Sequence, residues 1–282
     1  MTPKFNKALL PLLLGATLSL PAMAAERVIS AGAAVTELVM ALEGADKLVA
    51  VDVTSQIPEG MALPQLGYHR TLSAEGLLSL NPDLVVGSDE MGPKSALDIV
   101  RQAKVQVATL PAAETPQQLM ANIDTLAALL SEEDAAPSLK ATIQSQVDRI
   151  NQAKANLSRA PKVVFVLLRG DRGPRMGGGH TPADLLITLA GGENIAGFDG
   201  YKSASEETLL SLQPDLILVT KPAMDADNAA GELLESLPLL AHTPAGKNGQ
   251  IYDLPAKALL GGLGPSALDA AEDLAQKLAE IQ

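Results

Sequence analysis

The segments LLSLNPDLVV (77–86) and LLSLQPDLIL (209–218) have nearly the same sequence. In each, a short helical segment ends at an Asn/Gln-Pro-Asp turn, which is followed by the leucine and β-branched residues typical of a buried strand. A Gly-Tyr dipeptide precedes both segments, at 67–68 and at 200–201. This repetition predicts that the chain folds as two similar halves.

A second pair of related segments supports the duplication. GAAVTELVMALEGADKL (32–48) resembles GHTPADLLITLAGGENI (179–195), and the match places Glu37 opposite Asp184. Both pairs occur in the same order along the chain. Chance similarity between leucine-rich helices could explain one pair, but two pairs in register indicate an internal duplication.

Strands alternate with helices in both halves. Apolar strands are expected at 28–29 and 163–168, each followed by a glycine-containing loop and an amphipathic helix, and again at 84–86 and 216–219. This alternation is typical of parallel sheets with helices on both faces. The sequence therefore predicts an α/β fold with two Rossmann-like lobes.

Helical patterns separate the two halves. An amphipathic helix begins at Thr115-Pro116, and Ser131 with Asp134 resembles a capping box that opens a second apolar stripe. We therefore expect an N-terminal lobe at 25–130, one long connecting helix at 131–160 and a C-terminal lobe at 161–282. A ligand should bind in the interlobe cleft, at the carboxyl ends of the strands.

The first residues have the features of a secretory signal peptide. Lys4 and Lys7 precede a mostly apolar run, and Ala22-Met23-Ala24 matches a small-x-small cleavage site. The run is shorter than the about 20 apolar residues that cross a bilayer. We expect residues 1–24 to be removed and the mature protein to be periplasmic.

Composition and motifs exclude several functions. A net charge of −12 without a basic block argues against a nucleic-acid partner, and the absence of cysteine excludes thiolate metal sites and thiol nucleophiles. The sequence contains no G-x-S-x-G, H-E-x-x-H or phosphate-loop motif, so no enzyme is expected. The glycine-rich run 170–179 is interpreted as a loop of the cleft, although a plain surface loop fits it equally well.

The remaining ligand candidates are histidines and a tyrosine. His69 and His180 lie in predicted cleft loops, which keeps a zinc or manganese site open, but neither has a neighbouring carboxylate in the sequence. Tyr68, two residues before Arg70, is the stronger candidate, because ferric iron and a nearby guanidinium both stabilise a phenolate. Packing of Tyr68 against the other lobe is the alternative that spacing alone favours.

The run GYHRTLSAEG (67–76) resembles the G-Y-x-R-x-L-S-A-E-G signature of the periplasmic haem-binding proteins of bacterial haem-uptake ABC transporters. These are single-helix-linked, class III substrate-binding proteins, related to cobalamin and siderophore binders. The resemblance extends over essentially the whole mature chain and includes the segments 181–192 and 261–268. The two-lobe pattern is shared with the cobalamin- and siderophore-binding relatives and says little about cargo, whereas the ten-residue run is much more specific.

The resemblance implies a role for each site residue. Tyr68 would supply the axial phenolate to haem iron, with Arg70 supporting its charge, and Tyr201 would line the opposite wall. Some family members bind a second haem through a histidine near 168–172, where this chain has arginines instead. The expected ligand-binding set is Tyr68, His69, Arg70, Arg169, Arg172, Met176, His180 and Tyr201, with no catalytic residue.

The resemblance also implies a partner. Glu75 and Glu207 occupy equivalent positions in the two repeats and would dock with arginines of an inner-membrane ABC permease dimer that carries its ATPase. Two acids placed at helix N-termini for the dipole are the simpler alternative. The expected function is a monomeric protein of iron acquisition, with haem as cargo. A cobalamin or ferric-siderophore binder is the alternative, and a zinc or manganese binder is less favoured.

Overall fold

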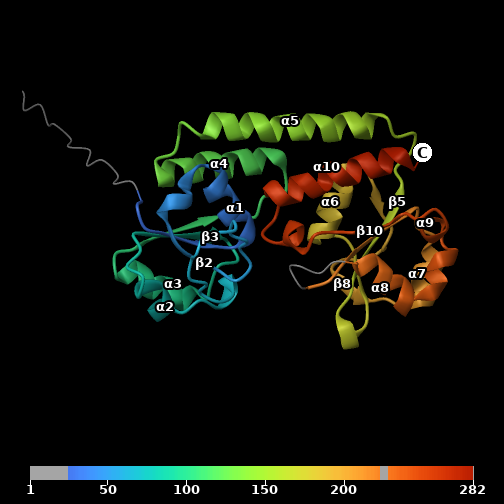
Figure 1. Cartoon of the computed structure of the whole chain (residues 1–282), viewed down its shortest axis with the longest axis horizontal. Coiled ribbons are helices and arrows are strands. Elements are labelled where there is room, and N and C mark those ends of the chain that lie inside the picture. The colour runs from blue at the N-terminus through green and yellow to red at the C-terminus, as the bar shows by residue number, and fades with distance from the viewer. Residues whose placement is uncertain (1–24, 223–227, 282) are drawn as a thin grey trace, which may run out of the picture.

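The computed structural model describes residues 25–222 and 228–281 (Figure 1). The expected signal peptide at 1–24 lies outside these residues. The described chain forms two α/β lobes, each with its own sheet, and helix α5 (Ala136–Ala155) runs along both of them (Figure 1). The predicted fold class, two Rossmann-like lobes joined by a long α-helix, is confirmed.

The N-terminal lobe has a parallel sheet in the order β2-β1-β3-β4. Val28 and Leu84 point into a core under the helices α1, α4 and α5, while Ile29 and Val85 point into a core under α2 and α3. Side chains alternate between faces along a strand, so both faces are covered. The elements are β1 (Val28–Ala31), α1 (Ala33–Ala41), β2 (Leu48–Val51), α2 (Ala74–Leu78), β3 (Leu84–Ser88), α3 (Lys94–Gln102), β4 (Gln106–Leu110) and α4 (Pro116–Leu130).

The C-terminal lobe has the strand order β10-β9-β5-β6-β8, with β7 paired to β5. β6 runs antiparallel to β5 and β8, unlike the fully parallel sheet that we expected. The chain reverses direction in the loop 168–174, where Gly170 and Gly173 adopt positive φ angles that favour glycine. The elements are β5 (Lys162–Leu167), β6 (Arg175–Gly177), α6 (Pro182–Ala190), β7 (Glu193–Asn194), β8 (Tyr201–Ser203), α7 (Glu206–Leu212), β9 (Leu216–Thr220), α8 (Ala229–Ser236), α9 (Pro244–Lys247), β10 (Ile251–Asp253) and α10 (Pro265–Glu280).

The repeated Pro-Asp turn has the same structural role in each lobe. Asp83 accepts hydrogen bonds from the backbone N–H groups of Glu26 and Arg27, both at 3.0 Å, just before β1. Asp215 accepts one from the N–H of Lys162, at 2.8 Å, where β5 starts. Each carboxylate thus satisfies backbone donors beside the first strand of its lobe.

The helical region between the lobes contains two helices separated by a break. Ser131 adopts a left-handed conformation at the end of α4, with φ of 55°, and does not cap the following helix. α5 begins at Ala136, with Pro137 in its first turn, where a missing N–H has no cost. The connecting helix is therefore shorter than the range 131–160 that its apolar stripe predicted.

Further contacts hold the two lobes together. Glu37 of α1 accepts hydrogen bonds from the backbone N–H (2.9 Å) and the hydroxyl of Ser266, and so caps α10 from the other lobe. The N–H of Leu263 donates to the carbonyl of Ala113, at 2.7 Å. Gly262 permits this approach, because a Cβ there would lie only 2.9 Å from the backbone of Ala113.

These connections predict that the lobes move little on binding a ligand. With α5 intact and α10 bonded to α1, we expect closure to be a tilt of a few degrees, not a wide hinge motion. Small-angle scattering profiles of the ligand-free and loaded protein should superimpose. A clear compaction on loading would contradict this prediction.

Candidate ligand-binding site

Tyr68 projects from a loop at the carboxyl end of the N-terminal sheet. The loop is fixed by a hydrogen bond from the N–H of Val53, just after β2, to the carbonyl of Gly67, at 3.0 Å. Tyr68 itself precedes a 3₁₀ turn, His69–Thr71, and receives a hydrogen bond at its carbonyl from the N–H of Thr71 (2.8 Å). Tyr68 and Val53 are 39% and 47% exposed. The loop therefore offers an aromatic phenol and an aliphatic side chain to a ligand.

Arg70 lies on the same turn and forms an ion pair with Glu90, in the loop that follows β3. Both side chains are substantially exposed, so this ion pair contributes little to stability. It joins the Tyr68 loop to the loop that follows β3. Sequence spacing does not point to Glu90 as the partner of Arg70, since only the folded sheet brings the loops after β2 and β3 together.

His69 is buried, in contrast to its two neighbours. It is 3% exposed, and its Nδ1 lies 3.0 Å from Oδ2 of Asp52, a residue that is 1% exposed. Asp52 also accepts hydrogen bonds from the hydroxyls of Thr54 and Ser55, both at 2.7 Å, and from the N–H of Gly32, at 3.0 Å. His69 thus belongs to a buried polar network below Tyr68, which sequence spacing did not reveal.

The charge of Asp52 is stabilised by these contacts. Burial alone would raise its pKa, but the hydrogen bonds from His69, Thr54, Ser55 and Gly32 outweigh burial and lower the pKa to about 2. Since the pKa is lower in the folded than in the unfolded chain, ionised Asp52 stabilises the fold above pH ~4.

This stabilisation should disappear as the pH falls from about 4 to about 2. We expect the difference in unfolding free energy between the wild type and Asp52→Asn to shrink by about 2 kcal/mol over that interval. Urea titrations of both proteins at several pH values measure it. A difference that does not change with pH would contradict the assignment.

In the C-terminal lobe, Arg169 and Arg172 lie in the loop 168–174, at the carboxyl end of β5. This loop borders a cavity of about 890 Å³ that also extends to the end of β9, where Lys221 forms an ion pair with Glu232 at 2.6 Å. The charged side chains of its lining are of both signs, Arg169 and Lys221 with Glu232 and Glu235. Its lining includes Leu168, Arg169, Gly170, Gly173, Pro174, Lys221 and Leu237.

Two expected site residues, Met176 and Tyr201, pack against the core of the C-terminal lobe. Met176 is only 2% exposed and lies in the core on one face of the sheet, opposite Val166. Tyr201 is half-buried on the other face, where it packs edge-on against Phe165 with the two ring centres 6.4 Å apart. The Cζ atom of Arg175 lies 5.7 Å from the centre of the Tyr201 ring. Burial raises the pKa of Tyr201, with the charge of Arg175 opposing that effect. The described contacts do not join either residue to Tyr68.

The remaining histidines are at the surface. His180 has a positive φ of 58°, its N–H donates to Asp184 at 3.1 Å, and its side chain is exposed with Asp199 4.0 Å away. No group of three or more histidine, aspartate or glutamate side chains suited to a metal ion occurs within the described residues. Over the same part of the chain, no helix has the length and apolar character needed to span a bilayer.

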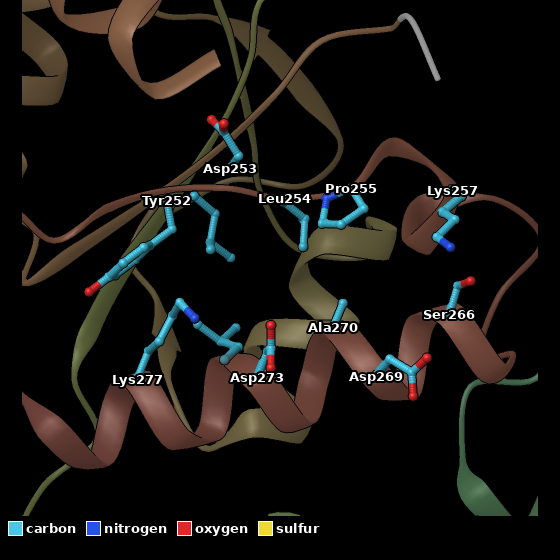
Figure 2. Close-up of a pocket in the computed structure, with 12 residues that line it drawn as sticks. Tyr252, Asp253, Leu254, Pro255, Lys257, Ser266, Asp269, Ala270, Asp273 and Lys277 are labelled. Atoms are coloured by element: carbon cyan, nitrogen blue, oxygen red, sulfur yellow. The ribbon is translucent and has the colours of Figure 1, made fainter. Parts of the chain in front are cut away.

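A second cavity lies between the loop after β10 and helix α10, and none of the expected site residues lines it. Figure 2 shows Tyr252 and Lys277 on one side of it and Asp269 and Ser266 on the other. The ammonium of Lys277 lies 5.0 Å from the centre of the Tyr252 ring. This surface is separate from the Tyr68 loop, which belongs to the other lobe.

Glu75 and Glu207 have matching positions in the two lobes. Each is the second residue of its helix, α2 or α7, and each helix begins after a serine whose hydroxyl accepts an N–H from the first turn. Both glutamates are exposed, and the two helices lie far apart on different lobes (Figure 1). The arrangement leaves one carboxylate per lobe available to a partner.

Comparison with known proteins places this geometry in a family. The model of the periplasmic binding protein family matches residues 28–258, and the chain belongs to that family. The periplasmic heme-binding protein HutB of Vibrio cholerae is 40% identical, with a TM-score of 0.80, over 88% of this chain and 97% of that one. A periplasmic heme-binding protein from Pseudomonas aeruginosa is 35% identical, with a TM-score of 0.77, over 89% and 91%. The resemblance inferred from the Tyr-containing signature is thereby confirmed.

The family also includes relatives with other cargo. The vitamin B12-binding protein of Yersinia pestis is 28% identical over 228 residues, which are 80% of this chain and 80% of the relative. The alternative cargo considered from the sequence is therefore represented among the relatives. Identity is higher to the two heme-binding proteins.

Proposed function

We propose that this chain is a periplasmic substrate-binding protein that captures haem and delivers it to an inner-membrane ABC importer. The observation that carries the proposal is the exposed Tyr68, presented beside Arg70 on a loop anchored from below by His69 and Asp52. An exposed phenol next to a guanidinium is suited to binding ferric iron as a phenolate. The 35–40% identity to two heme-binding proteins supports the same cargo.

The two lobes would have different roles at the site. Tyr68 would ligate the iron from the N-terminal lobe, Arg70 would stabilise the negative charge of its phenolate, and Val53 would contact the porphyrin. Arg169 and Arg172, at the strand ends of the C-terminal lobe, would pair with the anionic propionates. His180 is sufficiently exposed to approach a cargo, whereas Met176 and Tyr201 would support the C-terminal wall from within the lobe.

The remaining expectations belong to the same proposal. Residues 1–24 would direct export and be cleaved, and residues 25–130 and 161–282 would form the lobes on either side of the connecting helix. The mature chain would act as a monomer without catalytic activity, and haem would be its cargo. Glu75 and Glu207 would contact the two subunits of the permease.

Direct competition between cargoes tests this proposal. Calorimetric titration of the mature protein should give saturable binding of ferric haem at least ~100-fold tighter than that of cobalamin, a difference of about 2.8 kcal/mol. Cobalamin is the second candidate because of the vitamin B12-binding relatives. Equal or tighter binding of cobalamin would overturn the choice of haem.

A further inference from the structure

His69 is the buried member of the Tyr68-His69-Arg70 tripeptide. Tyr68 and Arg70 extend toward solvent, whereas His69 lies between the loops that follow β2 and β3. Its carbonyl accepts a hydrogen bond from the N–H of Gly92 at 2.9 Å, and the carbonyl of Gly92 accepts one from the N–H of Leu72 at 2.8 Å. The backbone of the tripeptide is therefore held on the loop that contains Glu90.

The imidazole of His69 is fixed by Asp52. Because Asp52 is ionised, it can only accept hydrogen bonds, so Nδ1 of His69 must carry the proton that they share. Asp52 is itself immobilised, since the network continues from Ser55 to Thr36 (2.7 Å) and from Thr36 to Ser30 (2.7 Å). These hydroxyls connect the imidazole to β1 and α1, which belong to the rigid part of the lobe.

The fixed imidazole is in contact with Tyr68. The centres of the two rings are 4.4 Å apart, and their planes are inclined by 54°. His69 therefore forms a rigid surface against which the phenol packs. Its Nε2 is buried 3.9 Å from Glu90, without a hydrogen-bond partner among the described residues, and so is not presented to a cargo.

We propose that His69 is a positioning residue, which transmits the rigidity of the Asp52 network to the ring of Tyr68 and is not itself a ligand. This inference rests on the proposed function, since it assigns Tyr68 to the cargo. It replaces the expected ligand role of His69. The contact with Asp52 requires that the side chain at position 69 has an N–H donor at the position of Nδ1.

Substitutions at His69 separate this donor from side-chain volume. The amide of His69→Asn can place an N–H near the position of Nδ1, the longer His69→Gln places it further out, and His69→Leu has no donor. His242→Leu is the control, because His242 is exposed in the C-terminal lobe and is outside the proposed site.

The first measurement uses the ligand-free protein. Hydrogen exchange at the amides of Thr71 and Leu72 should accelerate about tenfold in His69→Leu and His69→Gln, corresponding to 1.4 kcal/mol of local opening. Exchange should remain near the wild-type rate in His69→Asn and in His242→Leu. Unchanged exchange in His69→Leu would overturn the proposal, whether or not the protein binds haem.

The second measurement uses the fully loaded ferric complex. We expect the high-spin electron paramagnetic resonance signal to broaden in His69→Leu, because the iron–phenolate geometry becomes heterogeneous, and to sharpen again in His69→Asn. Identical spectra in the wild type and His69→Leu would overturn the positioning role.

Replacement of a low-spin by a high-spin signal in His69→Leu would instead show that His69 is a ligand. A wild type that binds no haem would refute the proposed function, while the exchange result would still decide the role of His69.

Discussion

Tyr68→Phe is expected to release ferric haem more than ~100-fold faster than the wild type. The substitution removes one oxygen atom and leaves the ring that packs on His69. Even residues that only support a metal ligand change affinity by about 10–100-fold, so loss of the ligand atom should exceed that range. Transfer of haem to an excess of a haem-scavenging apoprotein measures the rate.

A matched control is available in the same chain. Tyr252→Phe also removes one hydroxyl, which donates to Gln250 at 2.6 Å, in a half-buried position of the C-terminal lobe. We expect its release rate to equal that of the wild type. If Tyr68→Phe retained haem as well as Tyr252→Phe does, Tyr68 would not be the iron ligand.

The double variant Glu75→Ala/Glu207→Ala is expected to bind haem normally but to lose at least tenfold in import. Each glutamate is exposed on its own lobe, so neither substitution should disturb the fold or the Tyr68 loop. If each carboxylate pairs with an arginine of the permease, removing both should cost at least about 1.4 kcal/mol, which is tenfold in docking affinity. Haem uptake by vesicles containing the importer measures this effect, at fixed concentrations of loaded protein.

A charge-matched variant isolates the docking role. Glu133→Ala/Glu280→Ala removes the same charge from exposed positions between α4 and α5 and at the end of α10. It should import haem at the wild-type rate, and each single variant at Glu75 or Glu207 should be intermediate. Equal losses in both double variants would attribute the effect to net charge.

The two-lobe fold could be predicted from the sequence because the duplicated segments form the same turn and the same strand in each lobe. Asp83 and Asp215 each satisfy backbone donors beside the first strand of a lobe, so the Pro-Asp turn recurs with the strand that follows it. The Tyr-containing signature then indicated the family. These features are local, and local sequence is sufficient to identify them.

Features that depend on long-range pairing were not predictable. His69 is buried because the loops after β2 and β3 enclose it beside Asp52, and no spacing within the Tyr68 loop indicates that partner. Met176 enters the core because β6 pairs with β5 in a register that places it opposite Val166. Ser131 is a residue type that commonly caps the start of a helix, but it adopts a left-handed conformation at the end of α4 instead.

The most direct test of the central claim, that Tyr68 binds the iron of captured haem, is a resonance Raman spectrum of the wild-type ferric complex. Excitation into a phenolate-to-iron charge-transfer band should enhance tyrosinate modes and an iron–oxygen mode that shifts with the iron isotope. We predict that these modes are present in the wild type and in Tyr252→Phe and are absent in Tyr68→Phe. A spectrum without tyrosinate modes, or one that Tyr68→Phe leaves unchanged, would contradict the claim.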